Sequence, residues 1–238
     1  VADFSTNEYI SCDGTVQFTD LTENIPVAWY WDFGDSTTSS LQNPTHSYTS
    51  TDTFTVTFAA SNLYGSDTII KSAYVIVNLN GQPVTPACTP ATLGYCCEIG
   101  IYNFTFSTIN NTSSDAREGY RDFSCPVQTT VMQGFIYPVS VQTDDLNPQD
   151  VKIWIDYDND GSLNDTSEVV FSAFNAKSPS GNIAISNNSV INTPLRLRVS
   201  TDNVGNTLNS CSNPINGQAE DYTVIIQPNT APPIGNFT

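Results

Sequence analysis

The side chains best suited to chemistry in this sequence are a run of oxygen donors between residues 153 and 168. Carboxylates stand at alternate positions and a glycine follows them, a pattern typical of Ca²⁺-binding loops. The candidate ligands are Asp156, Asp158, Asp160, Ser162, Asn164 and Glu168. Ca²⁺ takes roughly six to eight hard oxygens, and Gly161 allows the sharp turn that would wrap the chain around it. The pattern predicts Ca²⁺ as the cofactor; a solvated acidic turn is the alternative.

Catalytic side chains are scarce. His46 is the only histidine, and it lies in a turn motif where we expect a structural role. A single histidine in such a place makes Ser-His-Asp and histidine–metal catalysis poor explanations. An enzymatic hypothesis rests only on paired carboxylates, Asp144 with Asp145 and the Asp156 loop, and nothing places these across a cleft as glycoside hydrolysis requires. The sequence predicts no catalytic residue and no enzyme activity.

The charge balance argues against two classes of partner. The 238 residues hold 24 acidic and 7 basic side chains, which gives a net charge of −17. A nucleic-acid-binding protein needs a basic face, which so few cations cannot form. An acidic membrane surface would repel the chain, and no apolar stretch reaches the length of a transmembrane helix. We expect no nucleic-acid partner and no direct membrane insertion.

Six cysteines without the spacing of a zinc site indicate disulfide bonds and an oxidising, extracellular environment. They are Cys12, Cys88, Cys96, Cys97, Cys125 and Cys211. The adjacent Cys96 and Cys97 make a poor pair with each other, so each should have a distant partner. We favour bridges from the Cys88–Cys97 group to Cys125 and Cys211, with Cys12 taking the remaining partner and clamping two domains. Six reduced thiols in a cytosolic protein are the alternative.

The elements that must position these residues are strands. Apolar and polar side chains alternate with a period of two in runs such as Phe54–Ala60 and Leu195–Val199, and helical periodicity is nearly missing. Clusters of Asn, Asp, Ser, Gly and Pro separate the runs. Trp29, Trp31 and Phe33 share one face by this alternation, so we expect them in a core. The pattern predicts an all-β chain of two antiparallel β-sandwich domains.

Breaks in the periodicity divide the chain. We predict a first domain at residues 1–79, a linker at 80–87, a second domain at 88–227, and at 228–238 a linker with the start of a next repeat. The last residues, 233–238, echo residues 1–5 in their order of apolar, small, Asp or Asn, Phe and hydroxyl side chains. We therefore expect the chain to be one period of a tandem array, with neighbouring repeats as its partners.

Three motifs in the first domain carry a family resemblance. They are Trp31-Asp32-Phe33-Gly34-Asp35, Asn43-Pro44-Thr45-His46-Ser47-Tyr48 and Thr53-Phe54-Thr55-Val56-Thr57. In this order and spacing they resemble the PKD domain. The resemblance implies an Ig-like sandwich that serves as an extracellular spacer or adhesion module. This chain departs from the family at Ser36, where a glycine is usual.

The second domain resembles the GEVED domain over residues 88–227. The segments that carry the resemblance are Cys88-Thr89-Pro90, Tyr95-Cys96-Cys97, Glu118–Asp122, Trp154–Gly161, Pro194–Val199 and Gly217-Gln218-Ala219-Glu220-Asp221. Gln218 and Ala219 depart from the signature that gives the family its name. The resemblance implies a β-sandwich of secreted bacterial proteins, especially large Bacteroidota surface proteins, and no enzymatic activity. Glu220 and Asp221 either support the Ca²⁺ loop or pair with Arg196 or Arg198.

Two short segments resemble modification sites. Asp35-Ser36-Thr37 and Asp67-Thr68-Ile69 are similar to the O-glycosylation sites of Bacteroidota secreted proteins. Ser36 and Thr68 are therefore candidate O-glycosylation sites.

The features together favour a structural and adhesive role. We expect a non-enzymatic repeat unit of a long extracellular bacterial surface protein, an adhesin stalk or filament, stiffened by Ca²⁺ and disulfide bonds. Identical chains or surface glycans are further expected partners. The alternative is an accessory module that binds glycans or another surface and is attached to a secreted hydrolase. Tyr30, Tyr64 and Tyr157 are the candidate aromatic platforms for that alternative.

Overall fold

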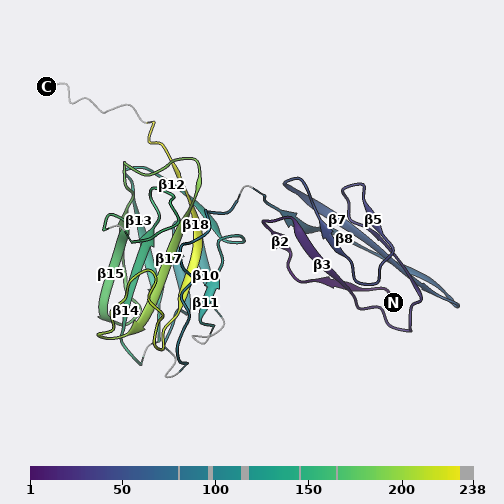
Figure 1. Cartoon of the computed structure of the whole chain (residues 1–238), viewed down its shortest axis with the longest axis horizontal. Coiled ribbons are helices and arrows are strands. Elements are labelled where there is room, and N and C mark those ends of the chain that lie inside the picture. Colours follow the sequence, from purple (N-terminus) through teal and green to yellow (C-terminus); the bar gives the residue numbers. More distant parts are fainter. Residues whose placement is uncertain (80, 96–98, 114–117, 145, 165, 231–238) are drawn as a thin grey trace. The chain divides into compact units, whose positions relative to one another are not determined.

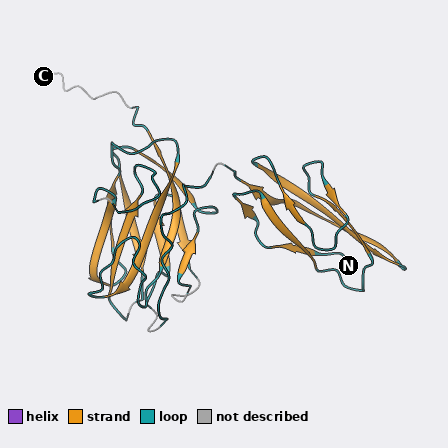
Figure 2. Cartoon of the chain, viewed as in Figure 1, coloured by secondary structure: helices purple, strands orange, loops and turns teal. Residues whose placement is uncertain are grey.

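The computed structural model describes residues 1–79, 81–95, 99–113, 118–144, 146–164 and 166–230. Cys96, Cys97, Asp145 and the terminal echo at residues 233–238 lie outside the described residues. The chain divides into two compact units, Val1–Gly81 and Gln82–Thr238. Every described element is a strand, which confirms the predicted all-β class (Figure 2). No helix long and apolar enough to cross a membrane occurs in the described part of the chain.

The first unit is a sandwich of two sheets (Figure 1). The smaller sheet has the order β1-β3-β6, formed by β1 (Phe4–Thr6), β3 (Thr15–Asp20) and β6 (Thr45–Ser47). The larger sheet has the order β2-β8-β7-β4-β5, formed by β2 (Ile10–Ser11), β8 (Gly65–Val77), β7 (Asp52–Asn62), β4 (Ala28–Asp32) and β5 (Thr38–Ser39). All pairings are antiparallel except that of β2 with β8, because the chain passes from one sheet to the other between β1 and β2.

Aromatic side chains fill the core between these sheets. Trp31 is fully buried and stacks on Phe58 with 4.0 Å between ring centroids, and Phe33 is also buried. Trp29 is only partly buried, and its indole N–H donates to Asp20 at 2.8 Å. The predicted shared face of β4 therefore forms part of the core. Burying such large rings supplies much of the stability of a small sandwich.

The second unit is a larger sandwich (Figure 1). One sheet has the order β10-β9-β13-β16, formed by β10 (Ile109–Thr112), β9 (Asn103–Phe106), β13 (Ile136–Gln142) and β16 (Ser180–Ala184). The other sheet has the order β11-β18-β17-β14-β15, and β12 also pairs with β18. Its strands are β11 (Tyr120–Asp122), β18 (Ala219–Gln227), β17 (Pro194–Asn203), β14 (Gln149–Ile155), β15 (Val169–Ala176) and β12 (Gln128–Met132). β11 and β12 run parallel to β18, since the long connection from β12 to β18 imposes no hairpin.

The central strands of this second sheet are buried on both faces. Leu197 of β17 faces the main core, whereas Arg196 and Arg198 lie on the opposite face and are 3% and 0% exposed. Loops cover that face: the N–H of Ala91 donates to Asn213, and the N–H of Leu93 donates to the carbonyl of Pro214. The alternation in β17 is therefore real, but its polar positions face a second, polar interior rather than solvent.

Candidate metal centre

The acidic loop connects β14 to β15, and backbone hydrogen bonds join its two ends to each other and to β17. The N–H of Ile155 donates to the carbonyl of Glu168 at 2.9 Å, and the N–H of Asp156 donates to the carbonyl of Arg196 at 2.9 Å. The last residues of a buried strand therefore fix Asp156 and Glu168 side by side. Both are buried, at 0% and 2% exposure.

Three carboxylates gather inside this loop. One oxygen from each of Asp156, Asp158 and Glu168 lies within 4.8 Å of the other two, with Asp158 exposed to solvent. Burial raises the pKa of Asp156 to about 6; the N–H of Gly161 counteracts this in part, and the nearby Asp158 carboxylate adds to it. A divalent cation with hard oxygen ligands would offset both the burial and the repulsion. The donor set fits Ca²⁺.

The backbone of the loop curls around Asp156. Its carboxylate accepts the N–H of Gly161 at 3.0 Å and that of Asp160 at 3.2 Å. Asn159 and Gly161 both adopt left-handed backbone conformations, with φ of 59° and 84°. The side-chain oxygen of Asn159 is buried and has no hydrogen-bond partner among the described residues. The predicted turn at Gly161 is therefore present, and the loop holds one further oxygen without a partner.

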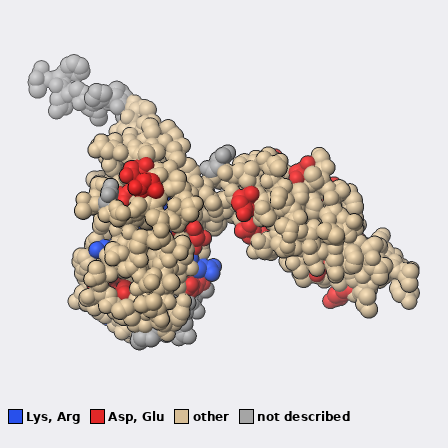
Figure 3. All heavy atoms as spheres, in the orientation of Figure 1, with Lys and Arg blue, Asp and Glu red and all other residues tan. Residues whose placement is uncertain are grey.

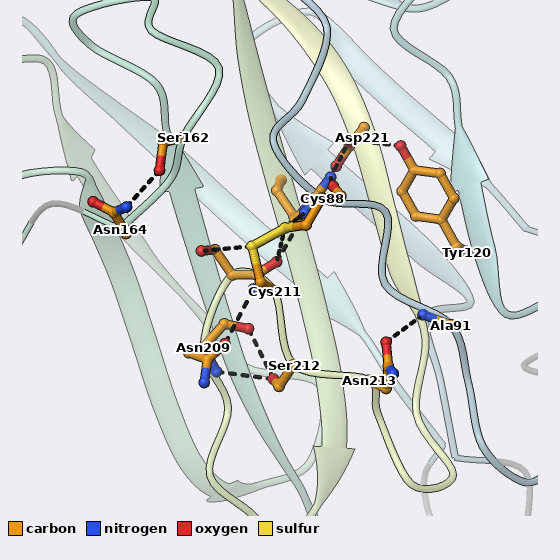
Figure 4. The surroundings of a disulfide bond; sticks show 12 residues. Cys88, Ala91, Tyr120, Ser162, Asn164, Asn209, Cys211, Ser212, Asn213 and Asp221 are labelled. Atoms are coloured by element: carbon orange, nitrogen blue, oxygen red, sulfur yellow. Dashed lines mark hydrogen bonds and ion pairs between the residues drawn. A yellow bond between two sulfur atoms is a disulfide. The ribbon is translucent and has the colours of Figure 1, made fainter.

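The other three predicted ligands contact one another instead. The carboxylate of Asp160 accepts the N–H of Ser162 at 2.6 Å, and the side-chain amide of Asn164 donates to the hydroxyl of Ser162 at 2.5 Å (Figure 4). Asp160 is not part of the carboxylate cluster. Of the six residues predicted from the spacing, the structure brings Asp156, Asp158 and Glu168 together.

A segment from the predicted linker lies against this loop. The N–H of Ala87 donates to the carbonyl of Gly161 at 2.7 Å, and Arg196 donates to the carbonyl of Val84 at 3.2 Å. A Cβ atom on Gly161 would lie 2.6 Å from the carbonyl oxygen of Thr85. Residues 84–87 are thus hydrogen-bonded to the second unit. Periodicity could not reveal this, because a strap without regular structure has no repeating pattern.

Asp221 lies at the centre of a buried ionic network. Arg198 donates to both of its carboxylate oxygens at 2.6 and 2.7 Å, and Arg196 donates at 2.7 Å. The hydroxyl of Tyr120 donates to the same carboxylate at 2.8 Å (Figure 4). Arg198 also donates to the carbonyl of Cys88 at 3.1 Å. Of the two alternatives for Asp221, the structure shows pairing with the arginines.

Glu220 belongs to a different buried cluster on the core face. The hydroxyls of Ser113 and Tyr222 and the side-chain amide of Gln218 all donate to its carboxylate, Tyr222 at 2.6 Å and Gln218 at 3.1 Å. Burial raises the pKa of Glu220 to about 7 despite the Ser113 and Tyr222 hydrogen bonds. Glu220 therefore neither pairs with Arg196 or Arg198 nor joins the carboxylate cluster of the acidic loop.

Disulfide bonds are present in the structure. Cys88 and Cys211 are bonded across 123 residues of sequence, within the second unit as predicted (Figure 4). Cys12 and Cys125 are also disulfide-bonded. Cys96 and Cys97 lie outside the described residues, and the proposed clamp through Cys12 stays a prediction.

His46 has the surroundings of a structural residue. Its ring stacks on Phe33 with 4.1 Å between centroids and meets Tyr48 edge-on. The same ring nitrogen, Nε2, contacts Asp35 at 2.8 Å and Thr37 at 3.3 Å. A catalytic relay needs the acid and the nucleophile on opposite ring nitrogens. This arrangement instead closes the turn that follows β4.

The remaining predicted surface residues differ in exposure. Ser36 and Thr68 are exposed, as O-glycosylation requires, and whether they carry sugar stays a prediction. Tyr30 and Tyr64 are 50% and 96% exposed, but Tyr157 is 7% exposed and packs in the core. Tyr157 therefore cannot serve as an aromatic platform, because the loop just after β14 places its ring in the core.

Comparisons with known proteins agree with these two sandwiches. Residues 1–77 match the family model of the PKD domain, and residues 150–225 match that of the GEVED domain. A PKD domain in the first unit is therefore followed along the chain by a GEVED domain within the second unit. Residues 88–149, which the predicted resemblance included, lie outside the GEVED match. No curated protein sequence matches the chain.

Two solved structures are similar to parts of the chain. The PKD1 domain from the Vibrio cholerae metalloprotease PrtV is 27% identical, covers 32% of this chain and 94% of its own, and has a TM-score of 0.28. A structure described as carbohydrate-binding modules from the β-sandwich superfamily is 14% identical, covers 78% of this chain and 84% of its own, and has a TM-score of 0.31. Neither score supports an argument about what this chain binds.

Proposed function

We propose that this chain is a non-catalytic repeat unit of a long extracellular surface protein, an adhesin stalk or filament, stiffened by Ca²⁺ and disulfide bonds. The observation that carries the proposal is the group of Asp156, Asp158 and Glu168 oxygens within 4.8 Å of one another at the end of a buried strand. Two of these carboxylates are buried, and burying like charges together is costly unless a cation joins them.

The domain content supports a structural role. PKD and GEVED domains are typically non-catalytic modules. The disulfide between Cys88 and Cys211 is consistent with an oxidising, extracellular environment. Described carboxylates outnumber cations on the visible face of each unit (Figure 3), which suits a soluble surface protein in a calcium-rich medium.

Calcium would stiffen the unit by tying together segments far apart in the sequence. Asp156 follows β14 and Glu168 precedes β15, so one ion between them closes the loop. The Gly161 carbonyl in the same loop holds the N–H of Ala87, so the order of the loop extends to the strap at residues 84–87. An ion that binds only the folded state stabilises that state by about 2.7 kcal/mol at a hundred times its dissociation constant.

Calcium titration of the full chain tests this proposal. We expect calorimetric binding of Ca²⁺ and a higher melting temperature of the second unit in Ca²⁺ than in chelator. Asp158→Asn should weaken binding about tenfold or more, because Asp158 lies in the cluster. Asp160→Asn is the matched control, since this neighbouring exposed carboxylate lies outside the cluster. Equal melting in Ca²⁺ and chelator, with no heat of binding, would refute the calcium part.

The repeat-unit part has a separate test. The complete open reading frame should contain several copies of this PKD–GEVED unit in tandem. A single copy joined to a catalytic domain would instead favour the accessory-module alternative.

A further inference from the structure

The strap at residues 84–87 is weakly attached to the second unit. The N–H of Ala87 donates to the carbonyl of Gly161 at 2.7 Å, and the guanidinium of Arg196 donates to the carbonyl of Val84 at 3.2 Å. Within the described part of the chain, the strap makes no other hydrogen bond. Segments with few buried contacts and exposed hydrogen bonds open at low free-energy cost. The strap can therefore detach while the sandwich beneath it stays folded.

Both attachment points of the strap depend on the acidic loop. Gly161 lies within this loop; its N–H donates to the carboxylate of Asp156 at 3.0 Å, and its carbonyl holds Ala87. Arg196 accepts the N–H of Asp156 through its backbone carbonyl at 2.9 Å and holds Val84 through its side chain. Each attachment of the strap is thus made by a residue that is itself hydrogen-bonded to Asp156.

The anchoring changes at Cys88, directly after the strap. Cys88 is bonded to Cys211, which lies in the loop between β17 and β18 (Figure 4). Beyond it, the N–H of Leu93 donates to the carbonyl of Pro214 in the same loop at 2.8 Å. Neither attachment involves the acidic loop. The segment from Cys88 onward therefore stays fixed to the second unit whatever the state of that loop.

The acidic loop has a physical reason to open when it holds no cation. The carboxylates of Asp156 and Glu168 are buried, and one oxygen of each lies within 4.8 Å of an oxygen of Asp158. Like charges this close repel one another, and burial strengthens the repulsion. A divalent cation bound between them removes the repulsion. The loop is therefore closed when loaded and looser when empty, and the strap depends on the closed form.

We propose that the strap at residues 84–87 is a Ca²⁺-controlled latch, docked while the acidic loop holds the ion and released as far as Cys88 when the loop is empty. The inference rests on the calcium site proposed above and adds its regulatory consequence. The first unit ends at Gly81, so release adds residues 84–87 to the free chain that precedes Cys88. Fully extended, these residues span about 13 Å. Calcium thereby sets the length of the tether between the two units.

The coupling between strap and ion acts in both directions. If Ca²⁺ favours the docked strap by some factor, the docked strap raises the affinity for Ca²⁺ by the same factor. A change confined to the strap should therefore weaken Ca²⁺ binding although it removes no ligand. A segment that merely lies beside the loop would have no such effect.

Amide hydrogen exchange measured by NMR on the full chain, in Ca²⁺ and in chelator, tests the proposal. We expect the Ala87 amide to exchange about tenfold faster in chelator. The Leu93 amide, beyond the disulfide, is the internal reference and should change much less. Asp158→Asn should raise the Ca²⁺ concentration that protects Ala87 by the same factor as the calorimetric Kd. Asp160→Asn, outside the carboxylate cluster, should leave that concentration unchanged.

A substitution in the strap tests the reverse direction. Ala87→Pro removes the N–H that reaches Gly161 and leaves every carboxylate in place, so the calorimetric affinity for Ca²⁺ should fall about tenfold. Thr89→Pro is the matched control, because Thr89 is exposed, lies past Cys88 and donates no backbone hydrogen bond within the described part of the chain. Equal thermal melting of the two variants in chelator shows that both are folded.

The possible outcomes separate the latch from the calcium site. Ca²⁺ binding with equal exchange of Ala87 in Ca²⁺ and chelator, or with unchanged affinity in Ala87→Pro, would overturn the latch and leave the calcium site standing. Equal acceleration of Ala87 and Leu93 in chelator would also overturn the latch, because the second unit would then loosen as a whole. The absence of any heat of Ca²⁺ binding would overturn the calcium site and the latch together.

Discussion

Ser36 occupies a turn position where the PKD family usually has a glycine. It lies in the turn after β4 with φ of +73°, a left-handed conformation that glycine adopts without steric cost. The serine that replaces the usual glycine is therefore held in a backbone conformation that a side chain disfavours. A non-glycine residue in this region costs about 1–2 kcal/mol, part of which the lower entropy of its unfolded chain returns.

We predict that Ser36→Gly stabilises the first unit by about 0.5–1 kcal/mol. Urea unfolding of the first unit measures the change. Ser40→Gly is the control: Ser40 is exposed in the neighbouring loop but has no positive φ, so glycine there should destabilise slightly. If both variants lose stability equally, the strain at Ser36 is absent.

Glu220 makes the stability of the second unit depend on pH. Burial raises its pKa from the ordinary 4.5 to about 7, so the folded state holds a proton that the unfolded chain releases. The groups facing it are the uncharged Ser113, Gln218 and Tyr222; Glu118 raises and Arg121 lowers its pKa at longer range. Stability therefore falls as the pH rises from 4.5 to 7.

The test compares Glu220→Gln with the wild type. Glutamine keeps the shape and cannot ionise, so its second unit should lose less stability over the same pH range. Thermal melting between pH 5 and 7 records the difference between the two proteins. Parallel curves would contradict the assignment of this pH dependence to Glu220.

At the scale of elements, the strap at residues 84–87 and the acidic loop act as one unit. The carbonyl of Gly161 accepts the N–H of Ala87. Because Gly161 has no Cβ atom, the carbonyl of Thr85 can also lie close to it. Its φ of +84° is left-handed as well. Changes at this glycine should therefore affect the strap at residues 84–87 as well as the candidate metal centre.

We predict that Gly161→Ala weakens Ca²⁺ binding and speeds hydrogen exchange at Ala87. Gly205→Ala is the matched control, because Gly205 has φ of +87° but no atom within 4 Å of the added Cβ. The control should cost about 1–2 kcal/mol from backbone strain alone, and Gly161→Ala about 1–3 kcal/mol more from the clash. Equal losses in the two variants would show that the strap does not press on the loop.

At the scale of the molecule, the Cys88–Cys211 disulfide joins the two segments that cover the arginine face of the second unit. Arg198 donates to the carbonyls of both Cys88 and Ser210, so the bond and the ionic network share their neighbours. A cross-link across 123 residues restricts the unfolded chain strongly. Its loss also loosens the cover over a buried charge.

We predict that Cys88→Ser with Cys211→Ser destabilises the second unit by about 2–5 kcal/mol and leaves the first unit unchanged. Calorimetry of the full chain separates the two transitions, and the first unit serves as the internal control. A second transition unmoved by the double substitution would show that the ionic network alone holds the cover.

The fold was predictable because its signals are local. Period-two alternation and turn clusters predict strands, and the Trp31 and Tyr48 motifs are short enough to be recognised in sequence. The acidic loop was predictable for the same reason: alternate carboxylates before Gly161 are adjacent in the chain. Calcium binding at this loop stays a prediction that Ca²⁺ titration of the full chain tests.

What the sequence by itself determined is the all-β class, the two families and the residues of the acidic loop. Only the tertiary structure decided which loop oxygens meet, that Asp221 pairs with two arginines while Glu220 enters the core, and that Tyr157 is buried whereas Tyr64 is exposed. These outcomes depend on strand register and on loops that are distant in sequence. Neither leaves a periodic pattern, because a contact between remote segments is fixed only when both sheets have packed.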